Sequence, residues 1–312
     1  MSGTPDHVAL CYADDTELLG CGVPFLTDGL DRGDAVLLAL DPPRAELVLA
    51  AVNRPDKVTV VSTNLQYVRP AVAIKSYSEM FAQLIDGGAS AVRLLGEIPE
   101  LALSTAWDVW ARYEAAVTYA YDRFPLLSMC AYDTRTTPAW VLEDVAKTHS
   151  LVAHPGQGNL DNPGYVQPLS FLATTRPVVP YPIQAGPPAI ELVDPTPAEA
   201  RTAVTTLAAA SLRPDDLDDL VVSVSEVVSN AIKYGKPPVT LTLWPGPHHA
   251  VVTIHDNGPG PTDPFAGLIP TPTPTGGGYG LWIAHQLCHH VALTRTPTSY
   301  TTRLTMGDPH HP

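Results

Sequence analysis

Short runs rich in Val, Leu and Ala alternate with longer stretches in which apolar residues recur at helical spacing through the first half of the chain. We expect strands at 7–12, 35–40, 58–62, 91–95 and 125–131, and helices at 14–32, 42–52, 76–86, 106–123 and 138–147. Strands that alternate with helices are joined by crossover connections, which favour parallel pairing. The first half is therefore predicted to be an α/β domain with a mostly parallel sheet and helices on both faces.

The last third of the chain contains a long amphipathic helix between Pro214 and Gly235. Its apolar residues fall on one helix face and are Leu217, Leu220, Val221, Val224, Val228 and Ile232. A Pro and a run of Asp suit the N-terminal end of a helix, and Gly suits its C-terminal end. Further helices are expected at 197–210 and 282–289, and strands at 239–244, 250–255, 291–296 and 300–305.

A Pro- and Gly-rich stretch with little periodicity separates these two regions. Its prolines indicate a semi-extended linker rather than a free coil. We therefore expect a first domain at 1–152, a linker at 153–188 and a second domain at 189–307. Between residues 153 and 197, the stretches 169–173 and 189–193 are expected to pack as edge strands on either domain.

Glu226 and Asn230 are the first candidates for chemistry on the long helix. They are four positions apart and so lie on one side of the helix. A carboxylate can take a proton from a nucleophile, and an amide oxygen can bind a hard cation such as Mg²⁺. Alone, this spacing is more typical of two solvated side chains. Two later segments change that interpretation, namely Asp-Asn-Gly-Pro-Gly at 256–260 after a strand and Gly-Gly-Gly-Tyr-Gly-Leu at 276–281 before a helix.

These three pieces, in this order, resemble the motifs of the GHKL ATPases (gyrase, Hsp90, histidine kinases and MutL), and among them the anti-sigma-factor serine kinases. The matching positions are Glu226, Asn230 and Lys233 in the N box, Asp256, Gly258 and Gly260 in the G1 box, and Gly276, Gly278, Tyr279, Gly280 and Leu281 in the G2 region. The resemblance implies the two-layer α/β sandwich of this family, with helices on one face of a largely antiparallel sheet.

By the same resemblance, Glu226 is the general base and Asn230 holds Mg²⁺. Asp256 accepts a hydrogen bond from the adenine amino group, and the glycines let backbone amides approach the phosphates. Additional nucleotide contacts are implied for Lys233, Tyr279, Leu281 and Thr302. The segment 269–276 corresponds to the ATP lid. ATP and Mg²⁺ are thus the expected cofactors.

Three departures from the family pattern stand out. Tyr234 occupies a position where many relatives carry His, beyond the metal ligand. The last family box has Gly-Thr where this chain has Tyr300-Thr301-Thr302, which puts the contact by Thr302 in doubt. The helix expected at 197–210 contains no His and so offers no phosphoacceptor. A two-component autokinase is therefore not expected.

The first half resembles the MEDS sensory domain found beside regulatory kinases. The stretches that carry the resemblance are 7–12, 25–33, 93–97, 113–115 and 130–135, with His149 downstream. No Gly-x-x-x-x-Gly-Lys-Ser/Thr loop and no Gly-x-Gly-x-x-Gly loop follows its first strand. A RecA-like sheet without a phosphate loop is therefore expected, with nucleotide binding confined to the second domain.

Polar residues near strand ends make a second candidate site in the first half, because open α/β sheets bind ligands there. They are His7, Glu97, Asp133 and His149. Bonding within strand ends and loops is the plainer interpretation of these residues. A metal site from His7, Cys11, Cys130 and His149 is a further alternative, although their spacing matches no metal-binding signature.

Charge and cysteine usage narrow the class of protein. The formal net charge is −14 in 312 residues, which disfavours a partner that is nucleic acid or an anionic membrane and suits a basic protein partner. The 4 cysteines show no Cys-x-x-Cys spacing. No signal peptide or long apolar segment is evident, so a cytoplasmic location is expected.

The favoured hypothesis is an anti-sigma-type regulator that binds Mg-ATP and phosphorylates Ser or Thr of an antagonist protein. Its partners would be a sigma factor, an anti-anti-sigma protein or both, and a homodimer remains open. The alternative is a non-catalytic switch in which ATP orders the lid and sets partner affinity. Glu226 favours the kinase, because binding alone needs no base. A DNA- or chaperone-type GHKL ATPase is a third alternative, disfavoured because no transducer domain follows the sandwich.

Overall fold

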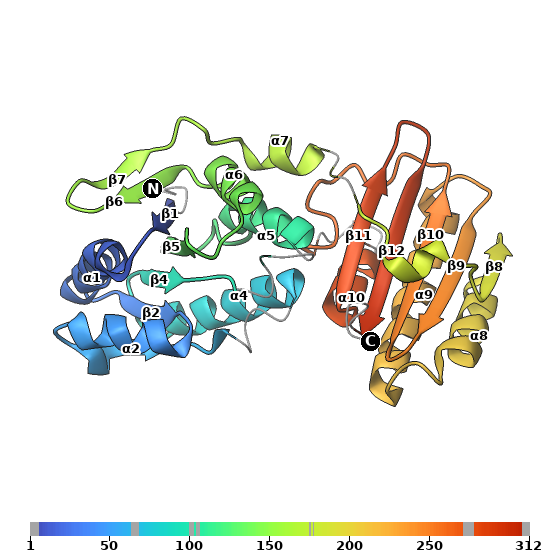
Figure 1. Ribbon diagram of the computed structural model, residues 1–312, viewed down its shortest axis with the longest axis horizontal. Helices are drawn as coiled ribbons and strands as arrows, with labels where there is room; N and C mark the ends of the chain where they lie inside the picture. Colours follow the sequence, from blue (N-terminus) through green and yellow to red (C-terminus); the bar gives the residue numbers. More distant parts are fainter. Residues whose placement is uncertain are drawn as a thin grey trace. The chain divides into compact units, whose positions relative to one another are not determined.

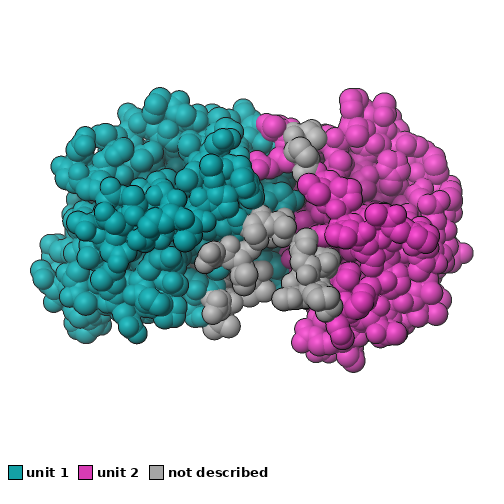
Figure 2. All heavy atoms as spheres, in the orientation of Figure 1, with its two compact units in different colours: residues 1–172 teal, residues 173–312 magenta. Residues whose placement is uncertain are grey.

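A computed structural model describes residues 6–63, 69–99, 103, 107–174, 176, 178–270 and 278–307 of this protein. The chain divides into two compact units, Met1–Leu172 and Ala173–Pro312, which are coloured separately in Figure 2. Each unit has its own sheet (Figure 1). Among the helices in these ranges, none combines the length and apolar character needed to cross a membrane.

The first unit is built on a seven-stranded sheet with the order β3-β2-β4-β5-β1-β6-β7. Its strands are β1 (Asp6–Tyr12), β2 (Ala35–Ala39), β3 (Val58–Val60), β4 (Val92–Gly96), β5 (Leu126–Asp133), β6 (Leu151–His154) and β7 (Gly158–Asp161). β7 pairs antiparallel with β6, and the other pairs are parallel. The prediction of an α/β domain with a mostly parallel sheet is confirmed.

Helices pack on both faces of this sheet. They are α1 (Asp15–Arg32), α2 (Pro42–Ala51), α4 (Pro70–Asp86), α5 (Trp107–Ala120), α6 (Ala139–Thr148) and α7 (Pro168–Ala173). Successive side chains of β1 point to opposite faces of the sheet. Val8 and Leu10 point to one face, where they pack in one core with Leu26 of α1. His7 instead contacts Glu114 of α5. Side chains of β1 that point away from α1 therefore reach α5.

Regular structure extends into the segment expected as a linker. β6 ends, β7 forms and α7 follows within residues 153–188. The edge strand expected at 169–173 was wrong, since these residues belong to the helix α7. A strand would bury alternate residues, whereas adjacent Phe171 and Leu172 are both buried and Leu169 is exposed. Pro168 provides a favourable first helical residue.

The second unit is a two-layer sandwich, as its sequence predicts. Its five-stranded sheet has the order β11-β12-β10-β9-β8, and every pair in it is antiparallel. The strands are β8 (Ile190–Val193), β9 (Thr240–Gly246), β10 (His249–Asp256), β11 (His290–Arg295) and β12 (Tyr300–Gly307). The helices α8 (Pro197–Ala208), α9 (Pro214–Tyr234) and α10 (Gly280–Leu287) lie on one face of this sheet (Figure 1). The prediction of an edge strand near 189–193 is confirmed by β8.

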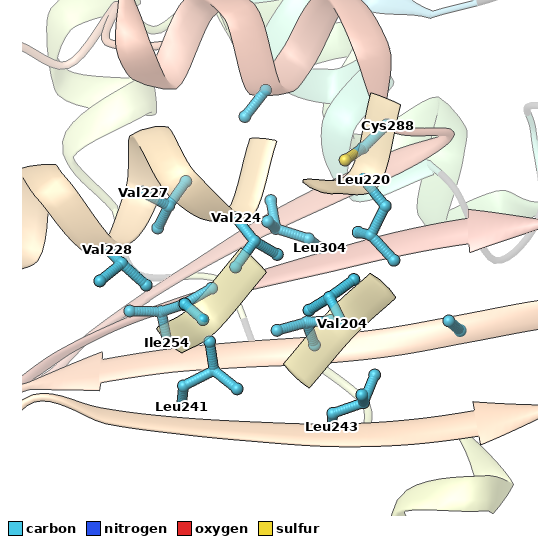
Figure 3. Packing of buried hydrophobic residues seen from close by; sticks show 14 of the residues in the cluster. Val204, Leu220, Val224, Val227, Val228, Leu241, Leu243, Ile254, Cys288 and Leu304 are labelled. Carbon is cyan, nitrogen blue, oxygen red and sulfur yellow. The ribbon is translucent and has the colours of Figure 1, made fainter. Parts of the chain in front are cut away.

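The helix α9 forms the centre of the second core. Its buried side chains meet those of β9, β10 and β12, as Figure 3 shows for Val224, Leu241 and Leu304. The predicted apolar face was wrong at its last residue, because Ile232 is 53% exposed and Ala231 is buried in its place. A repeat of four residues drifts around a helix that has 3.6 residues per turn, so the buried stripe moves back by one position.

Candidate functional site

Glu226 and Asn230 meet the backbone at the start of α10. Both side chains are half-buried on α9. A Cβ atom added to Gly280 would lie 2.8 Å from Asn230 Nδ2 and 2.8 Å from Glu226 Oε2. Because Gly280 has no side chain, its backbone can approach these two side-chain ends without displacing them. The structure thus brings the N box and the G2 glycine together.

Asp256 occupies a closed corner at the end of β10 and is 4% exposed. Its Oδ1 accepts hydrogen bonds from the backbone N–H groups of Gly258, at 2.6 Å, and Lys236, at 3.2 Å. A Cβ atom added to Gly235 would lie 2.5 Å from the same oxygen. The C-terminal end of α9 therefore packs directly against the Asp256 carboxylate. Gly235 and Gly258 are both needed for this contact, because a side chain at either position would overlap it.

Gly260 continues this corner in a left-handed backbone conformation, with φ of +69°. A Cβ atom added to it would lie 2.3 Å from Tyr300 Cδ2, on the first residue of β12. Tyr300 pairs directly with Asp256 across the two strands. Tyr300 was not predicted as a site residue, although it stands where the sequence departs from the family pattern.

Thr302 is buried on β12 and pairs with Ile254 of β10. Residues that pair across antiparallel strands share a face, and so do residues two positions apart on one strand. Thr302 therefore lies diagonally across from Asp256 on the face that α9 and α10 cover.

Most of the other predicted nucleotide contacts lie at the surface. Lys233 is exposed, with Nζ 4.9 Å from the centroid of the Tyr234 ring. Gly278 and Tyr279 are exposed just before α10, whereas Leu281 packs against the core. Gly276 and residues 271–275 of the predicted lid fall outside the described residues.

The polar strand-end residues of the first unit separate into two groups. Glu97 and Asp133 converge on Arg44, whose Nη1 is 2.9 Å from Glu97 Oε2 and whose Nη2 is 3.7 Å from Asp133 Oδ2. Burial raises the pKa of Glu97, while hydrogen bonds from Arg135 lower the pKa of Asp133. This group is explained by ion pairs at strand ends.

His7 and His149 form the second group, together with Cys130 and Glu114. Burial and the neighbouring His149 lower the pKa of His7 to about 4. Cys11, which the sequence analysis placed in this set, is exposed. His7 and Cys11 are four residues apart on an extended strand, roughly 13 Å, too far to share one ion. Glu114, rather than Cys11, is the fourth member of this group.

Both halves of the chain match known domain families. Residues 6–150 match the model of the MEDS domain, the MEthanogen/methylotroph, DcmR Sensory domain. Residues 193–306 match the histidine kinase-like ATPase domain. The chain therefore carries an N-terminal MEDS domain and a C-terminal histidine kinase-like ATPase domain, which confirms both resemblances. A domain of the second kind implies nucleotide binding.

One curated relative is the transcriptional repressor DcmR of Methylorubrum extorquens. It is 29% identical over 155 residues, covering 46% of this chain and 58% of DcmR. The match thus spans less than two thirds of that relative.

Solved structures with similarity include the RsbU and RsbW domains of Rv1364c from Mycobacterium tuberculosis, at 18% identity and TM-score 0.28, covering 39% of this chain and 32% of that one. The histidine kinase domain of a blue-light activated kinase from Erythrobacter litoralis matches at 20% identity and TM-score 0.25, covering 36% and 61%. The corresponding domain of the E. coli osmosensor EnvZ matches at 17% and 0.25, covering 41% and 93%.

Proposed function

We propose that this protein is a regulator of the anti-sigma type that binds Mg-ATP and phosphorylates Ser or Thr of an antagonist protein. The observation that carries the proposal is the convergence of Glu226 and Asn230 on the Gly280 backbone. A carboxylate able to take a proton and an amide able to bind a cation then flank the glycine of the G2 box.

The residues of the second unit fit the two expected cofactors. The closely packed Gly235 and Gly258 leave no side chain over the Asp256 carboxylate, which suits recognition of an adenine amino group. The amide oxygen of Asn230 beside a carboxylate suits Mg²⁺. When bound, ATP would supply the phosphoryl group, and Mg²⁺ would neutralise part of the charge on that group. Contacts with the nucleotide are proposed for Lys233, Gly260, Gly276, Gly278, Tyr279, Leu281 and Thr302.

Glu226 is assigned the proton transfer. Its half-buried carboxylate would accept the proton from the hydroxyl group of the acceptor Ser or Thr as that oxygen attacks. Asn230, one turn along α9, would fix the cation beside it. The glycines around Gly280 would keep side chains out of the space that the phosphates need.

The N-terminal domain is proposed to regulate these activities. The relative DcmR is a transcriptional repressor, which supports a role in transcription control for a chain that shares part of its length. We assign residues 1–152 to sensing, 153–188 to the connection and 189–307 to the kinase. The partner would be a sigma factor, an antagonist of the anti-sigma protein, or both. The net charge of −14 favours a basic surface on that partner.

A non-catalytic switch, in which ATP binding alone sets partner affinity, is the second candidate. It needs Asn230 and Asp256 but not Glu226, because no proton is transferred. The presence of a carboxylate against Gly280 favours the kinase.

Calorimetry of Mg-ATP binding, with a phosphorylation assay on proteins captured from native lysate, separates these functions. We expect the wild-type protein to bind, Asn230→Ala to lose most Mg²⁺-dependent affinity, and Glu226→Ala to bind but transfer no phosphate. Glu191→Ala, an exposed carboxylate on β8, is the matched control. Phosphate transfer by Glu226→Ala at the wild-type rate would refute its role as the base, and absence of ATP binding by wild type would refute the kinase.

A further inference from the structure

Four potential metal ligands from separate parts of the first unit meet in its interior. They are His7 on β1, Glu114 on α5, Cys130 on β5 and His149 directly after α6. Each offers one ligand atom, and these atoms all lie within 4.8 Å of one another. The central strands β1 and β5 are adjacent and parallel, and α5 covers the face to which His7 points.

The contacts centre on one carboxylate oxygen. His7 Nε2 and His149 Nε2 each lie 3.2 Å from Glu114 Oε2, and Cys130 Sγ lies 3.4 Å from His7 Nε2. The two imidazole rings lie against each other with centroids 3.9 Å apart and their planes tilted by 32°. Tetrahedral Zn²⁺ with bonds of about 2.0–2.3 Å holds its ligand atoms about 3.3–3.8 Å apart. The three short contacts match this geometry, and the remaining ligand atoms, all within 4.8 Å of one another, would have to move inward by about 1 Å or less.

Burial makes the cluster costly in the absence of a cation. Glu114 is 1% exposed and His149 is fully buried. Within the described part of the chain, the two imidazoles at 3.2 Å are the groups that offset the Glu114 charge, but the angles leave both Glu114 oxygens and His149 Nε2 without a well-formed hydrogen bond. A buried carboxylate without good hydrogen bonds is unfavourable. A cation between these atoms would satisfy all of them together.

The orientation of His149 is fixed from outside the cluster. Its Nδ1 lies 2.9 Å from the carbonyl oxygen of Val145. Because that oxygen can only accept, Nδ1 carries a hydrogen and donates the hydrogen bond. The lone pair then lies on Nε2, which faces Glu114. A hydrogen bond of this kind, from the far ring nitrogen to a carbonyl group, is how metal-bound histidines are held.

We propose that His7, Glu114, Cys130 and His149 bind a divalent transition-metal ion, with Zn²⁺ as the best fit. Two imidazoles, one thiolate and one carboxylate form the mixed nitrogen, sulfur and oxygen donor set that suits Zn²⁺ and disfavours Mg²⁺ and Ca²⁺. A cavity of about 30 Å³, lined in part by His7, Glu114 and Cys130, adjoins the cluster. It has room for a water-sized ligand beside the ion.

This site is independent of the proposed kinase, because all four ligands belong to the first unit. A bound metal ion would link β1, β5, α5 and the residue that follows α6, all of which lie within the MEDS domain. Cys130 and the two histidines thereby gain a common role, and the exposed Cys11 has none in it.

The test is metal content of the purified full-length chain after equilibration with Zn²⁺ and removal of free metal. We expect about one Zn²⁺ per chain, and Co²⁺ in its place should give the visible absorption of a tetrahedral thiolate complex. Glu114→Gln and Cys130→Ser should each lower metal occupancy at least tenfold at a fixed chelator concentration. Cys21→Ser and His154→Gln alter residues outside the cluster and are the matched controls. Both should keep the metal occupancy of the wild-type chain.

Thermal unfolding separates loss of the site from loss of the fold. Zn²⁺ should raise the melting temperature of the wild-type chain and of both controls, but not that of folded Cys130→Ser. The proposal is overturned if the folded wild-type chain retains no Zn²⁺ or Co²⁺. It is equally overturned if Glu114→Gln and Cys130→Ser both keep wild-type occupancy.

Discussion

Gly280 lies so close to Asn230 that a Cβ atom on Gly280 would be 2.8 Å from Asn230 Nδ2. Real Cβ atoms do not approach other atoms this closely, so Gly280→Ala must displace the Asn230 side chain or α10. Because Asn230 is the proposed Mg²⁺ ligand, moving its side chain should weaken Mg-ATP binding roughly tenfold, or about 1.4 kcal/mol. We expect calorimetry to show that loss in Mg-ATP affinity.

Gly186→Ala is the matched control for this change, because the nearest atom to its added Cβ, Ile183 O, is 3.6 Å away. It should bind Mg-ATP as the wild type does. Unchanged affinity in folded Gly280→Ala would show that the close contact with α9 has no part in nucleotide binding.

Asp256→Asn tests the buried corner at the end of β10. The amide oxygen of Asn can still accept the hydrogen bonds from Gly258 and Lys236, so the backbone turn should persist. The negative charge is lost, and an Asn amide group can present a donor to the adenine amino group. Hydrogen bonds to charged groups contribute about 1.5–3 kcal/mol, so ATP affinity should fall roughly ten- to hundredfold.

Asp215→Asn, on the exposed first turn of α9, is the control for charge alone. Circular dichroism should show both variants folded. Equal ATP affinities for the two variants would remove Asp256 from the proposed site.

Much of the candidate nucleotide site could be predicted from sequence because its parts are local. Glu226 and Asn230 are related by one helical turn, and the turn after β10 follows directly from Asp256 and its two glycines. Those relationships depend only on neighbouring residues.

Long-range contacts were not predictable in the same way. The approach of the Lys236 N–H group to Asp256 depends on how α9 ends against β10. Glu114 was not predicted as a partner of His7 because α5 and β1 are far apart in sequence. A carboxylate in a helix carries no local sign of what the opposite strand presents. Cys11 was included wrongly because proximity along a strand does not bring side chains together.

Substitutions at Leu220 and Ile232 test which face of α9 is buried. Both were predicted on one apolar face, yet Leu220 is fully buried and Ile232 is exposed. Leu220→Ala should lower the free energy of unfolding by about 2–5 kcal/mol through the cavity it leaves. Ile232→Ala should change it by no more than about 0.5 kcal/mol. Urea unfolding followed by fluorescence measures both, and equal losses would contradict the observed register.

Gly260→Ala should destabilise the second unit for two separable reasons. The backbone φ of +69° disfavours alanine, and the new Cβ would lie 2.3 Å from Tyr300 Cδ2. Left-handed backbone costs about 1–2 kcal/mol and overpacking about 1–3 kcal/mol, so a total of about 2–5 kcal/mol is expected. Gly88→Ala has a positive φ but open space around it, and should show the backbone part alone.

A double-mutant cycle with Tyr300→Ala isolates the contact between Gly260 and Tyr300. Alanine at 300 lacks the ring atoms that a Cβ atom at 260 would overlap, so Gly260→Ala should cost at least about 1 kcal/mol less in the Tyr300→Ala background. Urea unfolding of the four proteins provides the coupling free energy. Additive effects would mean that the turn after Asp256 relaxes away from β12, and that Gly260 is required there only for its backbone conformation.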